Sequence, residues 1–325
     1  MSWLGGTWLL LPALALDAGL GDPHWLWRRV PHPVALVGRL VDALDRRLNR
    51  ERDPPGTRRA KGVLAAVVIV AVAAGAGQAL RLLAAALPAG WIIELCAIAI
   101  LLGQRSLYEH VAAVADALQR DGIAAARAAV AHVVGRDTAR LDEAGVSRAA
   151  IESLAEGFCD AVVAPLLWYV VAGLPGMLVY KAVNTADSMI GHRSPRHEQF
   201  GWASARADDL LNLPAARLAA LVLVAVTPLA RGTAGAARAL RAVWSDAPRH
   251  RSPNAGWPEA AMAGALDLAL AGPREYAGET IDDAWMHPAG RRDARADDIR
   301  AGLSLYAAAC ALLFLLAVPV AFGLA

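Results

Sequence analysis

The segment "YKAVNTADSMIGH" follows twenty uncharged residues, Ala161–Tyr180, and carries polar groups at the end of that apolar run. Lys181, Asn184, Asp187 and Ser188 recur at intervals of three and four residues, which places them on one face of a helix. Random charges would be enough for solubility and would not need this spacing. The pattern therefore predicts one polar face of a functional site.

A second segment, "SARADDLLNLPAAR", places Asp208 and Asn212 one helical turn apart, with Arg206, Asp209 and Arg217 beside them. Asp and Asn oxygens suit Mg²⁺ held together with substrate phosphates, whereas zinc would need His or Cys in register. Either segment alone could be a helix-end cap with scattered charges. Ionisable groups are costly in an apolar chain, and several such segments together favour a site.

A third segment, "ESLAEGFCD", repeats a carboxylate every four residues at Glu152, Glu156 and Asp160. On a regular helix these side chains form one stripe and repel one another, so the spacing predicts a compensating cation. The alternative is a solvated helix face. Because Asp160 is flanked by apolar residues, we favour metal or substrate binding.

Two turns are candidates for anion binding. Ser252 and Asn254 lie in "HRSPNAGWPE", a turn that leads into an Ala-rich helix, and free N–H groups at a helix start can bind phosphate or carboxylate. An ordinary capped loop is the equal alternative. Arg136 and Asp137 lie in a second turn, "VGRDT", and could clamp an anionic ligand.

The elements that must position these groups are membrane helices. The chain has 325 residues, 57% of them hydrophobic, with a mean hydropathy of +0.38, which is beyond the range of most soluble domains. We expect an all-α, polytopic integral membrane helical bundle that forms a single domain, 1–325. The expected spans are about 3–20, 62–87, 91–104, 158–190 and 301–324.

Two of these segments leave alternatives open. The run 161–180 contains Pro165, Gly173, Pro175 and Gly176, so it is either one broken span or a hairpin of two short helices. Only about thirteen uncharged residues lie at 218–230, which suits a re-entrant or buried helix. We favour the hairpin, because it leaves every long polar loop on one side, as parts of one site should be.

Charge distribution predicts the orientation. Between Arg28 and Lys61 there are ten Lys/Arg residues and four acids, which places this loop in the cytoplasm. The first apolar run lacks Lys or Arg before its core, so we interpret it as a retained span and not a signal peptide. Net charge is near zero, and no nucleic-acid partner is expected. Cys96, Cys159 and Cys310 have no metal or redox spacing.

Taken together, the segments resemble the adenosylcobinamide-phosphate synthase family of cobalamin biosynthesis, the CobD/CbiB family. The similarity covers nearly the whole chain, in the order "DAGLGDP", "PHPVALVGRL", "VGRDTARLDE", "ESLAEGFCDAVVAPLLW", "YKAVNTADSMIGH", "FGWASARADDLLNLPAARL" and "HRSPNAGWPEAAMAGAL". Small departures are Ala161 and Asp267, where the family usually has Gly, and His192-Arg193, where Tyr-Lys is common. None of them removes a charged group from the site.

The resemblance implies an amide ligase in the cell (inner) membrane, with its active site facing the cytoplasm. It would join adenosylcobyric acid to (R)-1-aminopropan-2-ol or its O-phosphate, with ATP as co-substrate and Mg²⁺ as cofactor. We expect catalytic roles for Asp187, Asp208 and Lys181, and metal binding by Glu152, Glu156, Asp160, Asp187 and Asp208. Substrate and ATP binding is expected at Arg136, Asp137, Asn184, Ser188, Arg206, Asp209, Asn212, Ser252 and Asn254. Other pathway enzymes or a second copy of the chain are candidate partners.

Two alternatives belong to other classes. A membrane prenyl- or phosphatidyl-type transferase would use the Asp/Asn helices to bind a Mg²⁺-diphosphate and would consume no nucleotide. A cation carrier would need carboxylates in the middle of spans, whereas most of those seen here lie at span ends.

Overall fold

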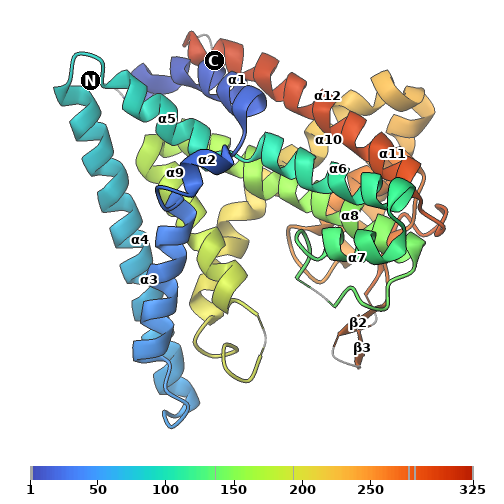
Figure 1. Ribbon diagram of the computed structural model, residues 1–325, viewed down its shortest axis with the longest axis horizontal. Coiled ribbons are helices and arrows are strands. Elements are labelled where there is room, and N and C mark those ends of the chain that lie inside the picture. Colours follow the sequence, from blue (N-terminus) through green and yellow to red (C-terminus); the bar gives the residue numbers. More distant parts are fainter. Residues whose placement is uncertain (1–2, 136, 193, 277–278, 282, 324–325) are drawn as a thin grey trace. The chain divides into compact units, whose positions relative to one another are not determined.

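Helices dominate the protein, as the sequence predicts (Figure 1). The computed structural model describes residues 3–135, 137–192, 194–276, 279–281 and 283–323. The chain forms two compact units, each assembled from separate stretches of sequence. The first comprises Met1–Gly103, Ala164–Asn212 and Ala317–Ala325, and the second comprises Gln104–Val163 and Leu213–Leu316. No break in composition marks these boundaries.

The first unit is built around three long helices, α3 (Pro33–Leu48), α4 (Pro55–Ala86) and α9 (Ala164–Ile190). These three pack against one another, and α3 and α4 run side by side in Figure 1. Their shared core is made largely of small and branched side chains, which let helices approach closely. It consists of Val41, Ala65, Ile69, Ala73, Ala182, Ala186, Ile190 and Phe200. The other elements of the unit are η1 (Trp3–Leu9), α1 (Leu10–Leu20), α2 (His24–Trp27), α5 (Trp91–Leu101) and the start of α10 (Trp202–Ser245).

The start of α3 explains the "PHP" sequence. His32 is the N-cap residue, and its Nδ1 accepts a hydrogen bond of 3.2 Å from the backbone N–H of Val34. Pro33 occupies the first helical position, where a missing N–H costs nothing. His32 therefore has a structural role in beginning the helix.

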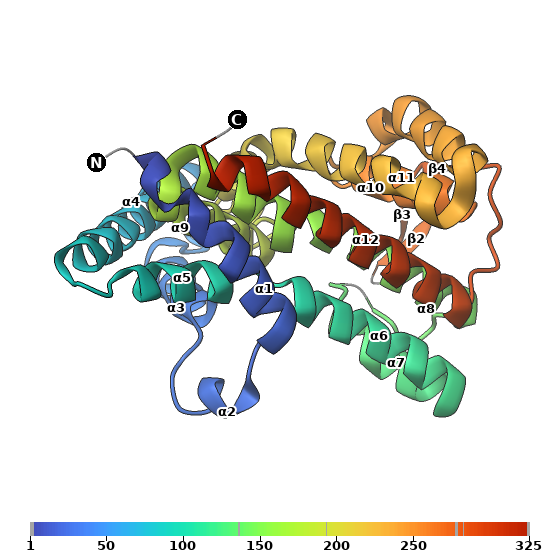
Figure 2. The same ribbon diagram turned by 90° about the horizontal axis from the view of Figure 1, so that it is seen from above.

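The second unit combines helices with two short β-pairs. Its helices are α6 (Gln104–Arg120), α7 (Ile123–Val130), α8 (Glu143–Gly157), η2 (Phe158–Val163), the rest of α10, η3 (Ala247–Arg249), α11 (Gly256–Leu266) and most of α12 (Ala296–Ala321). α6, α7 and α8 pack together, as Figure 2 shows for α6 and α7. β1 (Leu270–Ala271) pairs antiparallel with β4 (Trp285–Met286), and β2 (Arg274–Tyr276) pairs with β3 (Glu279–Ile281).

Within the described residues, five helical stretches are long and apolar enough to cross a membrane, so the chain is an all-α polytopic membrane protein. They are Pro55–Ala86, Trp91–Arg120, Glu143–Ile190, Trp202–Arg249 and Ala296–Ala321. Gly6–Leu20 is a shorter apolar helix, so a crossing at 3–20 stays a prediction. The segment 218–230 is part of α10, because helix continues on both sides of the uncharged run, and its re-entrant or buried placement stays a prediction.

A sharp break divides α9 where the sequence predicts a broken span or hairpin. Ala172 and Gly173 have non-helical backbone angles, with φ of +65° at Gly173, and Pro175 follows. Beyond the break the chain bends back so closely that a Cβ on Gly176 would lie 2.5 Å from the carbonyl oxygen of Trp168, eight residues earlier. A straight helix would separate these residues by about 12 Å.

Candidate functional site

Four side chains of α9 and α10 form a connected polar set inside the first unit. Asp208 accepts hydrogen bonds at both carboxylate oxygens, from Nδ2 of Asn184 at 3.2 Å and from Nδ2 of Asn212 at 3.0 Å. The Tyr180 hydroxyl donates to Oδ1 of Asn212 at 3.0 Å. Asp208, Asn212 and Tyr180 are all buried. The structure therefore brings Asn184 of "NTAD" and Asp208 of "DDLLN" into contact.

The spacing of these residues explains the set. Tyr180 and Asn184 are one turn apart on α9, and Asp208 and Asn212 are one turn apart on α10, so each helix presents two neighbouring groups. A buried carboxylate is costly without partners, and the two amides supply donors to both of its oxygens. Tyr180 was not among the predicted site residues, because it ends the apolar run and resembles core packing.

The other predicted residues of this unit lie around the set. Lys181 and Asp187 are half-buried on α9, and the Ser188 hydroxyl is exposed and donates to the Asn184 carbonyl at 2.9 Å. Asp187 lies against Gly191, where its carboxylate leaves no room for a Cβ. On α10, Arg206 and Asp209 pair with each other, Nη1 to Oδ2 at 2.9 Å.

The carboxylates of the second unit do not form the regular stripe expected from their spacing. α8 ends at Gly157, and Asp160 lies in the π-helical segment η2, whose wider turn changes the register. Glu152 is buried and accepts a 2.8 Å hydrogen bond from the backbone N–H of Ala271, whereas Glu156 is exposed. Among the described residues, no three His, Cys, Asp or Glu side chains gather closely enough to hold a metal ion.

A magnesium site at the predicted carboxylates does not require three of them to gather. Mg²⁺ bound with substrate phosphates needs only one or two protein carboxylates, and keeps water or phosphate at its other positions. The Asp and Asn oxygens of α9 and α10 are the right donor chemistry for such an ion. An all-protein cage of Glu152, Glu156 and Asp160 is not what the geometry supports, and their metal roles stay predictions.

The turn before α11 is more fully bonded than the sequence suggests. Oγ of Ser252 accepts hydrogen bonds from the backbone N–H groups of Asn254 and Ala255, both at 3.2 Å. Two of the N–H groups expected to bind an anion are therefore occupied within the turn. Arg217, which flanks the second polar segment in sequence, donates to Oδ1 of Asn254 and to the Pro253 carbonyl, both at 3.0 Å.

Arg217 is a functional candidate that the sequence indicates only as a flanking charge. Its guanidinium lies 4.4 Å from the ring centroid of Trp257, so an aromatic face and two acceptors fix its orientation. Close by, half-buried His250 and buried Glu259 of α11 face each other, with Nε2 and Oε2 3.7 Å apart. The "HRSPNAGWPE" segment thus surrounds a cationic side chain that could offset the charge of a bound anion.

The remaining anion candidate lies in the connection between α7 and α8. Asp137 is exposed, and its Oδ1 accepts a hydrogen bond of 2.9 Å from the backbone N–H of Ala139, which forms a turn. Arg136 lies outside the described residues, so a clamp made by this pair stays a prediction. The three cysteines form no disulfide: Cys159 is buried, Cys310 half-buried and Cys96 exposed.

Comparisons with known proteins agree with the sequence motifs. The CobD/CbiB protein family model matches residues 10–306. A "Cobalamin biosynthesis protein CobD" from Sinorhizobium sp is 51% identical over 317 residues, covering 96% of this chain and 98% of that protein. Proteins with the same name from Brucella suis and Rhodobacter capsulatus are 50% and 45% identical, covering 90% and 93% of this chain and the same shares of each relative. No solved structure matches. The chain belongs to the CobD/CbiB family.

Proposed function

We propose that this membrane protein acts in cobalamin biosynthesis as an ATP-dependent amide ligase. It joins the carboxylate of adenosylcobyric acid to the amine of (R)-1-aminopropan-2-ol or its O-phosphate, and the product is adenosylcobinamide or its phosphate. The observation that carries the proposal is the buried carboxylate–amide set of α9 and α10, in a chain that matches the family along nearly its whole length. The names of the relatives supply the pathway.

The chemistry explains why such residues are needed. A carboxylate does not react with an amine until it is activated. Its oxygen attacks the γ-phosphorus of ATP, ADP leaves, and an acyl phosphate forms. The amine nitrogen then attacks the acyl carbon, phosphate leaves, and the ammonium proton passes to a basic side chain. Positioning and charge neutralisation dominate the first step, and proton transfer assists the second.

We assign roles to this chain's residues on that basis. Lys181 and Arg206 offset phosphate charge, and the Asn184 amide helps to orient Asp208. Asp187 is the preferred base, because it is half-buried at the end of α9 and so more accessible to a substrate than the buried Asp208. When bound with the nucleotide, Mg²⁺ would supply further charge neutralisation. The Asp and Asn side chains of α9 and α10 would hold it through their oxygens.

We place this chemistry on the cytoplasmic side of the cell membrane. The basic α3–α4 connection is predicted to be cytoplasmic. Within the first unit, the residues that follow α9 contact this connection: Asn49 Nδ2 donates to the carbonyl of Arg196 at 2.9 Å. The two segments therefore lie on the same side of the membrane, and the end of α9 with Asp187 lies there too.

The direct test uses purified protein in detergent with adenosylcobyric acid, ATP, Mg²⁺ and either aminopropanol or its phosphate. We expect an amide product by mass and one ADP per product, with neither formed when the corrinoid is omitted. Product without nucleotide consumption, or turnover of a lipid diphosphate instead, would overturn the ligase and favour the transferase alternative.

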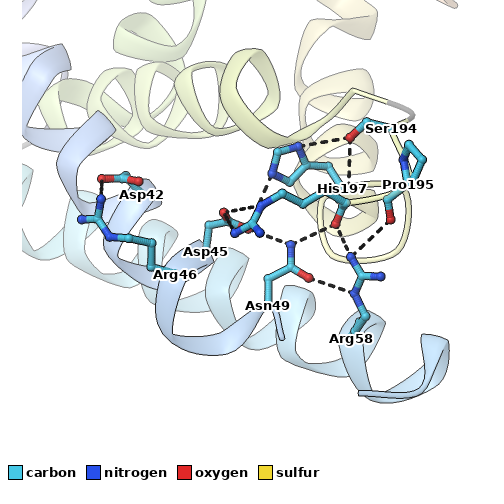
Figure 3. Close-up of polar contacts among 9 residues, drawn as sticks. Asp42, Asp45, Arg46, Asn49, Arg58, Ser194, Pro195 and His197 are labelled. Carbon is cyan, nitrogen blue, oxygen red and sulfur yellow. Dashed lines mark hydrogen bonds and ion pairs between the residues drawn. The ribbon is translucent and has the colours of Figure 1, made fainter. Parts of the chain in front are cut away.

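Variants connect the activity to the site. Asp187→Ala and Lys181→Ala are expected to lower kcat/KM by at least 100-fold while the protein still inserts and folds. Arg46→Ala is the matched control, because Arg46 is exposed on α3 and pairs with Asp42 (Figure 3). Retained turnover in both site variants would remove α9 from the active site.

A further inference from the structure

The residues between α9 and α10 are fastened to the α3–α4 connection by a cluster of polar side chains. We call residues 191–201 the 191–201 connection, and Asp45, Asn49, Arg58 and Arg196 the anchor cluster. Arg196 belongs to the connection, Asp45 to the last turn of α3, and Arg58 to the first turn of α4, while Asn49 is the C-cap residue directly after α3. Figure 3 shows Asp45, Asn49 and Arg58 close together, and Arg196 joins them through hydrogen bonds with Asp45 and Asn49.

Asp45 is the centre of the cluster. Its Oδ2 accepts two hydrogen bonds from the Arg196 guanidinium, from Nη2 at 2.6 Å and Nε at 3.2 Å, while Oδ1 accepts one from Nδ2 of Asn49 at 2.7 Å. The Asp45 side chain is 11% exposed. Burial acts against its ionisation, but the hydrogen bonds from Arg196 and Asn49 outweigh burial and hold the pKa of Asp45 below its ordinary value. An ion pair that has two hydrogen bonds and a largely buried carboxylate fixes geometry in a way that a fully exposed pair does not.

The backbone of the connection is held as well as its side chains. The Arg196 carbonyl accepts hydrogen bonds from Asn49 Nδ2 at 2.9 Å and from Nη2 of Arg58, whose Nε donates to Oδ1 of Asn49 at 2.9 Å. At the other end of the connection, the Phe200 carbonyl packs on Gly62 of α4 so closely that no Cβ would fit. Phe200 itself is part of the buried core.

The connection joins the two helices that carry the carboxylate–amide set. It begins directly after the last turn of α9, at Gly191 beside Asp187, and ends where α10 begins, two turns before Asp208. A connection of eleven residues can close in many ways, and fixing it restricts how α9 and α10 meet. The anchor cluster supplies this restriction from outside the site.

We propose that Asp45 and Arg196 are positioning residues of the ligase: by fastening the 191–201 connection to α3 and α4, they hold Asn184 and Asp187 of α9 in register with Asp208 of α10. The catalytic part of this inference rests on the proposed function, whereas the fastening itself does not. Neither residue touches the carboxylate–amide set, so their effect on turnover is transmitted through the connection.

The test compares Asp45→Asn and Arg196→Lys with Asp42→Asn. Asp42 is the matched control, because it lies one turn earlier on α3 and pairs with exposed Arg46 (Figure 3). Hydrogen exchange, followed by mass spectrometry on the intact protein in detergent, reports on residues 194–201, where His197, Glu198 and Gly201 donate backbone hydrogen bonds within the connection. Ligation kinetics are measured on the same preparations.

We expect at least tenfold faster exchange in residues 194–201 for both anchor variants and no change for Asp42→Asn. We expect kcat to fall at least tenfold with little change in the KM for ATP, because the binding groups remain. Arg196→Lys should retain more activity than Arg196→Ala, since one ammonium replaces only part of the two-pronged contact. The double variant Asp45→Ala/Arg196→Ala should exchange no faster than the worse single variant.

Other outcomes separate the two proposals. If exchange in residues 194–201 is unchanged in the anchor variants, the fastening is overturned, whatever the activity. If exchange rises but kcat is unchanged, the positioning role is overturned. If wild-type protein forms no amide and exchange still rises in residues 194–201 and in the last turns of α9, the ligase proposal fails while the fastening stands. If Asp45→Asn does not fold, Asn49→Ala replaces it in the test, because this variant leaves the Asp45–Arg196 ion pair intact. Faster exchange in residues 194–201 is expected for Asn49→Ala too.

Discussion

Asp208 accepts hydrogen bonds at both of its oxygens and is 9% exposed, so its removal is expected to lower both stability and ligation activity. Asp208→Ala leaves the amide donors of Asn184 and Asn212 without their acceptor, at about 1–3 kcal/mol each. We expect the free energy of unfolding to fall by about 2–4 kcal/mol and ligation to be lost. Asp208→Asn, with similar shape, should lose ligation but less stability. Unfolding in detergent measures the difference.

The control for this prediction is Asp209→Asn, which affects a half-exposed pair with Arg206 on the same helix. A pair of this kind contributes about 0–1 kcal/mol. Equal losses of stability in Asp208→Ala and Asp209→Asn would contradict the importance of the buried set.

Asp267 shows how one residue that departs from its family's pattern is accommodated. It has φ of 58° and ψ of 43° at the end of α11, a left-handed conformation that Gly adopts without strain and that Asp tolerates better than most residues. Its Oδ1 lies 2.9 Å from Nε2 of His287 and 3.5 Å from Nε of Arg238. We expect Asp267→Ala to destabilise the protein by about 1–2 kcal/mol and Asp267→Gly by less. Thermal unfolding distinguishes the two.

The same carboxyl group gives a pH prediction. The hydrogen bond with His287 holds the pKa of Asp267 below its ordinary value, with Arg238 contributing. The ionised form is therefore favoured in the folded state, so this stabilisation is present above the ordinary pKa of an aspartate and is lost as pH falls through the folded-state value. The stability difference between wild type and Asp267→Asn should shrink between pH 5 and pH 3. A difference that grows over this range would contradict the assignment.

At the scale of elements, the break in α9 depends on one residue. Gly173 has φ of +65° and ψ of −159°, a region that only Gly occupies without strain. Gly173→Ala should lower the free energy of unfolding by about 1–3 kcal/mol and should move Trp168 away from Gly176. Gly75→Ala is the control, because that helical site on α4 has open space around it and is expected to be neutral or slightly stabilising. Similar losses in both variants would show that the break tolerates a side chain.

The sequence predicts these elements unevenly, for physical reasons. Apolar runs predict α4 and α12, because length and composition alone decide whether a helix suits lipid. The uncharged run at 218–230 is much shorter than α10, because the helix continues into charged turns on both sides of the run. The "NTAD" and "DDLLN" segments indicate one shared site, because an apolar chain has few other reasons to carry such polar groups.

Other features are absent from local pattern. The π-helical turn at Asp160 depends on packing and not on spacing, so the expected carboxylate stripe is not regular. Asp45 lies in "LDRRLNRERD", which is typical of a solvated helix face, and only its distant partner Arg196 distinguishes it. Asp45 and Arg196 are 151 residues apart in the sequence, so neither the α3 segment nor the 191–201 connection alone predicts their contact.

For the molecule as a whole, the contact between Asn49 and Arg196 predicts membrane sidedness. In a chain whose native cysteines are replaced, Arg50→Cys and Glu198→Cys should react with a membrane-impermeant maleimide from the same, cytoplasmic side. Ala89→Cys should react from the opposite side, since α4 has 32 residues and is about 48 Å long. Comparing intact spheroplasts with inverted vesicles measures this. Labelling of positions 50 and 198 from opposite sides would contradict both the contact and the hairpin.

The interleaved first unit also has a consequence for biosynthesis. Val41, Ala65 and Ile69 share a core with Ala182, Ala186 and Ile190, which leave the ribosome more than a hundred residues later. At ordinary translation rates this delay is on the order of ten seconds. During that interval the α3–α4 pair must reside in lipid without its partner, which small apolar residues permit because their surface is compatible with acyl chains. In every round of synthesis, cellular quality-control proteases would therefore encounter the α3–α4 pair before its core is complete. This period ends when α9 is inserted and packs against the pair.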